Sequence, residues 1–404
     1  MKNKNIKNKK QKSKIIGFNI VEVVIIIIIS SAISIIATGV ITTNNNSTKS
    51  GTSYSELLND EKIRSFLDTY TSVINNYYGE VDKDKVIDSA IDGMMDYLGD
   101  KYSMYLDDYN TEILNDKLQG TYKGIGVSIS EDNTISDVFE DSPAASAGLK
   151  EGDKIIEVNG KDVKDKKSTE VIEIINEDQN NIKLKILRGD EEKEFDLKMS
   201  DVLRPTIASG IIDFQDKKVG YLYIESFSVS LTNQVKKALD KFDKESINGL
   251  IIDLRKNTGG YLTVAQTTSN LFLEKNKLIY SLETKKGNVS IYDESDEHKT
   301  YPIVVVVDEV TASAAEILTA SLKDSYGAKV VGKKTYGKGL VQQTQDLNDG
   351  SMVKYSTAKW LRPNGECVEG NGIEPDFKIE DDTKADNKTT DNIYIDKALE
   401  VLFR

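Results

Sequence analysis

The feature that most constrains this chain of 404 residues is an apolar run near its start, from Ile15 to Ile41. Glu22 is its only charged residue, and the last nineteen residues of the run carry no charge. A helix of this length can cross a bilayer core of about 30 Å. Seven lysines and no acidic residue precede the run, and a basic flank of this kind stays in the cytoplasm. The sequence therefore predicts a cytoplasmic tail at 1–14, a membrane anchor at 15–41 and an extracytoplasmic remainder.

The apolar run is open to three further interpretations. A buried core helix fits it less well, because the run is so uniformly apolar. A cleavable signal peptide is a closer alternative, although no clean small-x-small cleavage site stands near the end of the run. The segment from Gly17 to Glu22 also resembles the processing site of type IV pilin-like proteins.

The composition limits which partners and which kinds of site the chain can have. Hydrophobic residues make up 38% and charged residues 29% of the sequence, a balance typical of water-soluble domains with a sizeable core. The net charge of −13 argues against nucleic acid as a partner, because binding it requires a basic surface. The chain has a single cysteine, Cys367, and a single histidine, His298. These numbers exclude an intramolecular disulfide and a zinc site built from several Cys or His ligands. A Ser-His-Asp triad would have to use His298, which lies in a charged segment at 292–299.

The chain after the anchor changes character several times. A polar linker at 42–53 leads into a predicted helical region at 54–118, where apolar residues recur at helical spacing. These residues are expected to pack on each other or on a partner chain. At the other end, 381–404 is predicted to be a tail with a terminal helix.

The segment 119–202 has short β-rich stretches with turn residues between them. Asn159-Gly160 is a tight-turn pair between two strand-like runs. The ordered series of Gly124-Ile-Gly-Val127, Ser142-Pro-Ala-Ala-Ser-Ala-Gly-Leu149 and these strands resembles a PDZ domain. The resemblance implies that the loop at Ile125, Gly126 and Val127 points backbone N–H groups at a peptide's terminal carboxylate, and that the next strand pairs with the peptide.

The segment 203–380 has an α/β pattern. Strand-like runs at 219–224, 250–253 and 301–308 alternate with helical patterns at 261–273 and 314–326, and the four valines from Val304 to Val307 indicate a buried central strand. Two of these units share a layout: strand 250–253 leads into Asn257-Thr-Gly-Gly260, and strand 303–307 leads into Ala312-Ser-Ala-Ala-Glu316. If the strands are parallel neighbours, both loops open at the carboxyl edge of the sheet, where α/β proteins build their sites.

Ser313 would then stand at a helix N-terminus, beside backbone amides from both loops. A hydroxyl next to two sources of N–H donors is the outline of an acyl-transfer site with an oxyanion hole. The simpler interpretation is that Ser313 only caps its helix.

Lys338 is the candidate base, because no histidine is well placed. A free lysine has a pKa near 10.4, so accepting a serine proton near pH 7 requires a fall of about three units, or about 4 kcal/mol. Burial of the amine can lower its pKa by this amount. The plain alternative is that Lys338 is a surface lysine in contact with solvent. The surrounding Gly332-x4-Gly337-Lys338 is nearly a phosphate-binding loop. Gly339 stands where that loop needs a hydroxyl, and strand-like residues follow instead of a helix, so we reject nucleotide binding.

These motifs together resemble the carboxyl-terminal processing proteases, also called tail-specific proteases or peptidase family S41. The resemblance is carried by Asp253–Gly260, Thr311–Glu316, Thr335–Gln342 and Trp360–Asp376, and it covers nearly everything from Phe66 to Asp376. It implies an α/β protease core of the crotonase/ClpP-like type at 203–380. The site that it implies consists of Ser313 as nucleophile, Lys338 as base, Gln342 as the residue that orients the lysine, and the amides of Gly259 and Ala314 as the oxyanion hole.

Two departures from the family pattern stand out. Thr258 occupies a position where proline is usual, and Ala315 one where serine is common. Neither removes a catalytic atom, although Thr258 could loosen the oxyanion loop. The resemblance implies no cofactor and no metal.

The sequence as a whole predicts a membrane-anchored serine endopeptidase that acts outside the cytoplasm on proteins or peptides with exposed C-terminal tails. Self-association into a homodimer or larger oligomer is also expected. A non-catalytic PDZ scaffold for protein C-termini is the alternative from another class, and an acyltransferase or thioesterase on a similar core is a second enzymatic one.

Overall fold

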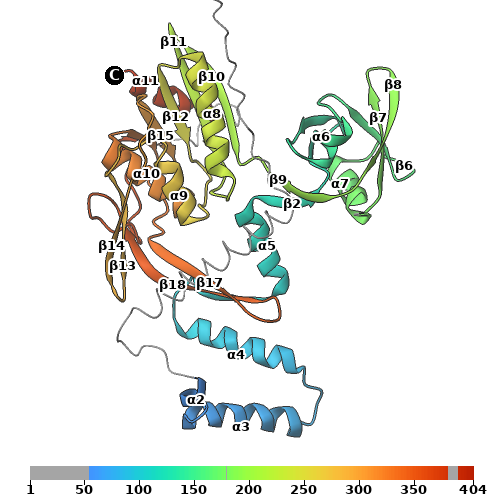
Figure 1. The fold of residues 1–404 in the computed structure, drawn as a ribbon, viewed down its shortest axis with the longest axis vertical. Coiled ribbons are helices and arrows are strands. Elements are labelled where there is room, and N and C mark those ends of the chain that lie inside the picture. Colours follow the sequence, from blue (N-terminus) through green and yellow to red (C-terminus); the bar gives the residue numbers. More distant parts are fainter. Residues whose placement is uncertain (1–53, 179, 381–389) are drawn as a thin grey trace, which may run out of the picture. The chain divides into compact units, whose positions relative to one another are not determined.

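The computed structural model describes residues 54–178, 180–380 and 390–404 (Figure 1). The anchor predicted at 15–41 and the linker at 42–53 lie outside these residues. None of the helices in the described ranges has the length and apolar character needed to cross a bilayer. The chain divides into two units, one ending at Lys83 and the other running from Asp84 to Arg404.

The first unit contains helices α2 (Tyr54–Leu57) and α3 (Glu61–Asn76). Asp60 begins α3 as its N-cap, and its carboxylate accepts hydrogen bonds from the N–H groups of Lys62 and Ile63. α3 is strongly amphipathic, yet none of its residues is buried. The helix therefore presents an apolar face that α3 itself cannot cover.

The second unit opens with α4 (Lys83–Tyr97), β1 (Met104–Leu106) and α5 (Asp108–Gln119). The sequence predicted helix throughout 54–118, and this is wrong at β1. Met104, Tyr105 and Leu106 pair with residues 352–354 of a later strand, so long-range pairing overrides the local helical pattern. The strand also fixes the loop that precedes it, Gly99 to Ser103.

The PDZ-like segment folds as strands and short helices. They are β2 (Thr121–Gly124), β3 (Val127–Ile129), β4 (Ile135–Val138), α6 (Pro143–Ala147), β5 (Lys154–Val158), β6 (Lys161–Asp162), α7 (Ser168–Glu177), β7 (Ile182–Arg188), β8 (Glu191–Leu197) and β9 (Ser200–Leu203). Asn159 and Gly160 have φ angles of 51° and 79°, which gives the predicted tight turn between β5 and β6. The strands enclose an apolar core of their own, which includes Ile135, Ile155, Val171 and Leu184.

The α/β segment is built on a six-stranded sheet. Its order is β10 (Ile207–Phe214), β11 (Lys217–Ile224), β12 (Gly249–Asp253), β15 (Ile303–Val307), β16 (Lys329–Gly332) and β19 (Phe377–Lys378). β10 pairs antiparallel, and the other pairs are parallel. The prediction that the strands before the two loops are parallel neighbours is confirmed, because Leu250 to Asp253 pair with Ile303 to Val306.

Helices cover both faces of this sheet (Figure 1). Leu250 and Ile252 belong to the core that contains residues of α8 (Leu231–Glu245), α9 (Leu262–Ser269) and α10 (Ala314–Ser321). Ile251, between them in the sequence, packs in the core with α11 (Thr390–Leu402). Burial on both faces explains why the strands are continuous apolar runs instead of alternating ones.

A second sheet contains β13 (Leu278–Thr284), β14 (Gly287–Tyr292), β17 (Leu340–Asp346) and β18 (Met352–Leu361). β18 is its hub, because it pairs with β1, β13 and β17. α10 runs on into a π-helical turn, η1 (Leu322–Tyr326).

The central strand gives a prediction for stability. Ile252→Ala should lower the free energy of unfolding by roughly 2–5 kcal/mol, because Ile252 is fully buried and its loss leaves a cavity. The midpoint of thermal unfolding should fall, measured by calorimetry on the purified chain. Val289→Ala, at an exposed position of β14, is the control and should leave the midpoint nearly unchanged. An equal effect of the two changes would contradict this account of the core.

Candidate active site

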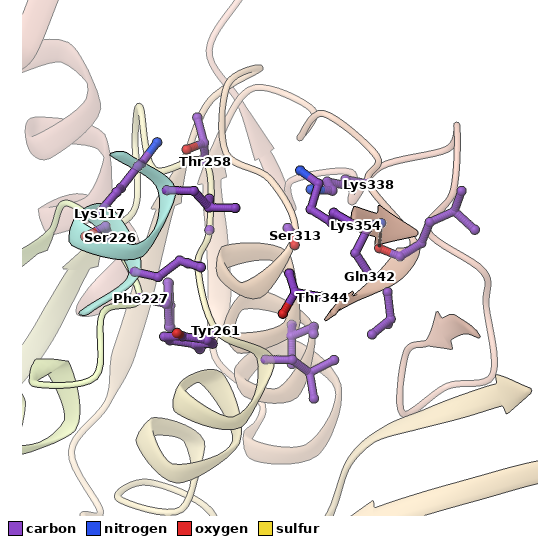
Figure 2. A pocket seen from close by; sticks show the side chains of 18 of the residues that line it. Lys117, Ser226, Phe227, Thr258, Tyr261, Ser313, Lys338, Gln342, Thr344 and Lys354 are labelled. Atoms are coloured by element: carbon purple, nitrogen blue, oxygen red, sulfur yellow. Dashed lines mark hydrogen bonds between the residues drawn. The ribbon is translucent and has the colours of Figure 1, made fainter. Parts of the chain in front are cut away.

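The two loops predicted to form a site meet at the carboxyl edge of the six-stranded sheet. Gly259 packs directly against the start of α10: a Cβ atom at this position would lie 2.9 Å from the Cβ of Ser313 and 2.9 Å from the Ala312 carbonyl oxygen. Its φ of 101° also favours glycine. The contact brings Gly259 and Ser313 to one wall of a cavity of about 370 Å³, which Figure 2 shows from close by.

Ser313 has an unusual backbone. Its φ is 57° and its ψ −120°, whereas the N-cap residues Asp60 and Asp107 have the extended backbone that is normal for a helix cap. A positive φ at a non-glycine residue costs free energy and is concentrated at functional sites. Ser313 is the N-cap of α10 and shares a capping box with Glu316, but its backbone differs from that of an ordinary cap.

The Glu316 carboxylate holds the Ser313 loop and the Lys338 loop together. It lies in the first turn of α10 and is fully buried. One oxygen accepts from the N–H groups of Ser313 and Lys338, at 2.8 and 2.9 Å. The other accepts from the Thr335 hydroxyl and the Gly337 N–H, at 2.5 and 2.8 Å. Burial raises the pKa of Glu316, and these four donors offset part of that rise.

Lys338 lines the same cavity as Ser313. Burial, followed by the charge of Lys354, lowers the pKa of the Lys338 amine, the direction that a general base requires. No ion pair within 4.0 Å involves this amine among the described residues, and no hydrogen bond joins it to the Ser313 hydroxyl. The structure thus brings Ser313 and Lys338 to one cavity without linking them directly.

Gln342 also lines the cavity. Its amide nitrogen donates to the Leu340 carbonyl oxygen at 2.9 Å and to the Ser356 hydroxyl at 3.3 Å. These bonds fix the side chain on β17 and β18, and its contact with Lys338 stays a prediction.

The two predicted oxyanion donors differ in their surroundings. The Gly259 N–H donates to the side-chain oxygen of Asn257 at 2.8 Å, and the Asn257 amide nitrogen donates to the Ile224 carbonyl oxygen. No hydrogen bond from the Ala314 N–H to another described residue is found. Of the two predicted donors, Gly259 lines the cavity and already has an acceptor within the chain, whereas Ala314 is buried at the start of α10.

Sequence reasoning missed several neighbours of this site. Lys354 on β18 lines the cavity, and the Tyr102 ring lies 4.9 Å from the Lys338 amine. The buried Asn257 belongs to a predicted motif, but its own role was not predicted. A lysine within a strand and a tyrosine in a turn give no local signal of such a position. It is the pairing of β1 with β18 that brings Tyr102 there.

The predicted peptide-binding loop borders a groove of about 240 Å³ in the PDZ-like domain. Ile125 and Val127 line it, together with apolar residues of α7 such as Ile172 and Ile175. Gly126 lies between them in the sequence with a φ of 84°, and a Cβ there would lie 2.1 Å from the Cβ of Ser142. The loop needs a glycine because it is pressed against Ser142.

Three family models match the chain. They are the peptidase family S41 at residues 218–379, the PDZ domain at 114–187, and the N-terminal domain of the activating protease CtpB at 28–110. The carboxy-terminal processing protease CtpA of Bacillus subtilis (strain 168) is 36% identical over 327 residues, which cover 80% of this chain and 70% of that protein.

A second relative and a solved structure are also similar. A probable CtpA-like serine protease of Staphylococcus aureus (strain N315) is 36% identical over 339 residues, covering 82% of this chain and 67% of that protein. A solved structure of a photosystem II D1 C-terminal processing protease matches with a TM-score of 0.49 and 23% identity, covering 84% of this chain and 92% of that one.

The domains and these relatives define a serine-type protease with a PDZ domain and a mixed α/β core. The chain belongs to the carboxyl-terminal processing proteases of peptidase family S41. The resemblance expected from the sequence is confirmed.

The Glu316 carboxylate gives a second prediction. Glu316→Gln replaces an accepting oxygen by an NH₂ group that faces N–H donors, so it should destabilise the fold by roughly 1–3 kcal/mol. Hydrogen exchange followed by mass spectrometry should become faster in peptides that contain Ser313 and Lys338. Glu309→Gln, at an exposed position of the preceding loop, is the matched control. Unchanged exchange in Glu316→Gln would contradict the role given to this carboxylate.

Proposed function

We propose that this chain is a membrane-anchored, extracytoplasmic serine endopeptidase that recognises C-terminal tails through its PDZ domain and cleaves peptide bonds with a Ser-Lys pair. One observation carries the catalytic part of the proposal. Ser313, with a strained backbone, and Lys338, with a lowered pKa and no ion-pair partner in the described part of the chain, line one cavity at the carboxyl edge of the sheet.

The proposed reaction uses these groups in order. The Ser313 oxygen attacks the peptide carbonyl carbon, and the neutral Lys338 amine takes the hydroxyl proton. The oxyanion that forms accepts hydrogen bonds from the backbone amides of Gly259 and Ala314. Lys338 then gives the proton to the leaving nitrogen as the C–N bond breaks. A water molecule, activated by the same amine, hydrolyses the acyl-enzyme and restores both residues.

Substrate recognition is proposed to begin at the PDZ groove. Its apolar lining from Ile125, Val127, Ile172 and Ile175 suits an apolar C-terminal side chain. The glycine loop offers backbone N–H groups that suit a terminal carboxylate. Proteins or peptides with exposed apolar tails are therefore the proposed substrates.

Single substitutions test the catalytic pair. Ser313→Ala and Lys338→Ala should each abolish cleavage of an unfolded substrate with an apolar C-terminus, while binding of a tail peptide survives. Lys338→Arg should also be inactive, because a guanidinium does not lose its proton in this pH range. Cleavage followed by gel electrophoresis and tail binding followed by fluorescence anisotropy give the two measurements.

The control and the alternatives follow from the same assay. Ser290→Ala, on the exposed strand β14, should cleave at the wild-type rate. Retained cleavage in Ser313→Ala would refute the assignment. Tail binding without cleavage in the wild-type protein would favour a PDZ scaffold, and turnover of acyl thioesters but not peptides would favour an acyltransferase or thioesterase.

The membrane anchor is proposed from the sequence alone. The uncharged stretch from Val23 to Ile41 and the seven lysines before Ile15 support a helix that crosses the bilayer with the protease domain outside.

Cys367 allows a direct test of this location, because it is the only cysteine and is partly exposed. A membrane-impermeant maleimide should label it in intact cells as fully as in lysed cells. Ile27→Arg, which costs roughly 2.5–3.5 kcal/mol at the centre of a membrane helix, should reduce the membrane-bound fraction. Cys367→Ser provides the labelling blank. Labelling that requires lysis would contradict an extracytoplasmic protease domain.

Self-association is proposed as well. α3 exposes Ile63, Phe66, Leu67 and Val73, and an amphipathic helix without a buried residue suits pairing with a second copy of this chain.

A further inference from the structure

A second lysine faces the cavity that holds Ser313 and Lys338. Lys354 lies on β18, where it pairs with Thr344 of β17 and Met104 of β1. It lines the same cavity as the two catalytic candidates, and Figure 2 shows Lys338 and Lys354 on the same side of Ser313. The proposed serine–lysine reaction makes no use of this second amine.

The Lys354 amine is half-buried and forms no ion pair within 4.0 Å with any described residue. Burial lowers the pKa of the Lys354 amine, and the charge of the Asp100 carboxylate offsets part of that fall. Burying an ammonium group without a direct partner is costly. A lysine is therefore a poor choice for this position on packing grounds alone, which points to a function for its charge.

Asp100 is held in place by its own loop and by β18. Its carboxylate accepts from the Ser103 hydroxyl at 2.7 Å and from the Tyr102 N–H at 3.0 Å. The Ser103 hydroxyl in turn accepts from the N–H of Ser356 at 3.1 Å. Burial would raise the pKa of Asp100, but hydrogen bonds from Ser356, Tyr102 and Ser103, together with the charge of Lys338, outweigh it and leave the pKa below its usual value. The carboxylate is thus a fixed negative charge beside β18.

Charged and titratable groups surround Lys338 from several elements. These groups come from five places in the chain. They are Lys354 on β18; Asp100, Lys101 and Tyr102 in the loop before β1; Tyr336 in the loop of Lys338 itself; Glu316 on α10; and Glu369 in the loop before β19. Tyr336, Asp100 and Glu316 favour the charged ammonium form of Lys338, and so does the face of the Tyr102 ring. Burial and the charge of Lys354 oppose them.

We propose that Lys354 is a positioning residue for the peptidase reaction: its ammonium group, which lines the same cavity, keeps Lys338 as the neutral amine that accepts the serine proton. This inference rests on the proposed function. Two lysines in one cavity titrate as a coupled pair, because a charge on one amine disfavours a charge on the other. Asp100 favours the ammonium form of both lysines, so it is the positive charge of Lys354 that opposes protonation of Lys338.

The pH dependence of kcat/KM tests this on the full-length chain. The acid limb of this profile reports the pKa of the base in the free enzyme. The substrate is an N-acetylated peptide with an apolar C-terminal residue and no group that titrates between pH 6.5 and 10.5. Lys354→Gln should move the acid limb up by about one pH unit, so the rate at neutral pH falls about tenfold while the alkaline plateau is kept.

Two further variants sharpen the result. Lys354→Arg keeps the positive charge and should leave the limb where it is. Asp100→Asn removes the charge that stabilises both ammonium groups, so the limb should move down. Opposite shifts from two neighbouring substitutions are not expected of residues that only support the fold, since these lower the rate equally at every pH. Lys359→Gln, an exposed lysine on the same strand, is the control and should give the wild-type profile.

The outcomes separate this inference from the function on which it rests. If the wild-type chain does not cleave the peptide, or if Ser313→Ala cleaves it, the proposed function fails. If both behave as expected but Lys354→Gln leaves the acid limb in place, the role of Lys354 is overturned and the function stands. Where thermal unfolding shows that Lys354→Gln does not fold, Lys354→Met decides: a higher limb supports the proposal, and an unmoved or lower limb overturns it.

Discussion

The Glu316 carboxylate is the contact on which the rest of the site depends. It takes hydrogen bonds from Ser313 and, more than twenty residues later, from Lys338, so one buried group fixes the spacing of both loops. Its oxygens are occupied by three backbone N–H groups and one hydroxyl, not by an ammonium group. A direct ion pair with Lys338 would have held that lysine in its charged form. The Glu316 carboxylate therefore positions the two loops without forming an ion pair with the Lys338 amine.

The sheet that contains β18 brings charged groups to the cavity that the six-stranded sheet does not provide. β18 places Lys354 in the cavity and, through its pairing with β1, brings in the loop with Asp100 and Tyr102. The proposed nucleophile thus follows a strand of the parallel sheet, and Lys354, Asp100 and Tyr102 come from a separate sheet that an N-terminal strand completes and from the loop before that strand. A short strand of three residues at the edge of a sheet has little stability of its own. Its value lies in what its loop delivers to the site.

The sequence predicted the parts of this molecule that follow from local chemistry. The valine run at 304–307 indicated a buried strand, and two strand–loop–helix units indicated a shared sheet edge, because such patterns depend on neighbours in the chain. The strand β1 could not be predicted, since Met104 to Leu106 become extended only by pairing with β18. The position of Lys354 in the cavity could not be predicted for the same reason, because its neighbours there come from distant segments of the chain. The roles of Ser313, Lys338 and Gln342 remain predictions that rest on the family pattern and on their position along one cavity.

The predicted oxyanion loop, residues 257–260, is held in one shape by hydrogen bonds within the chain. Asn257 is fully buried and spans from the Ile224 carbonyl oxygen to the Gly259 N–H. It thereby holds a turn in which Lys256 and Gly259 both have positive φ angles. The side-chain oxygen that accepts from Gly259 is neutral, whereas a tetrahedral intermediate would present a full negative charge. Hydrogen bonds to ionised acceptors are about twice as strong as neutral ones. We therefore expect the Gly259 N–H to leave Asn257 for the substrate oxygen only as negative charge develops on that oxygen.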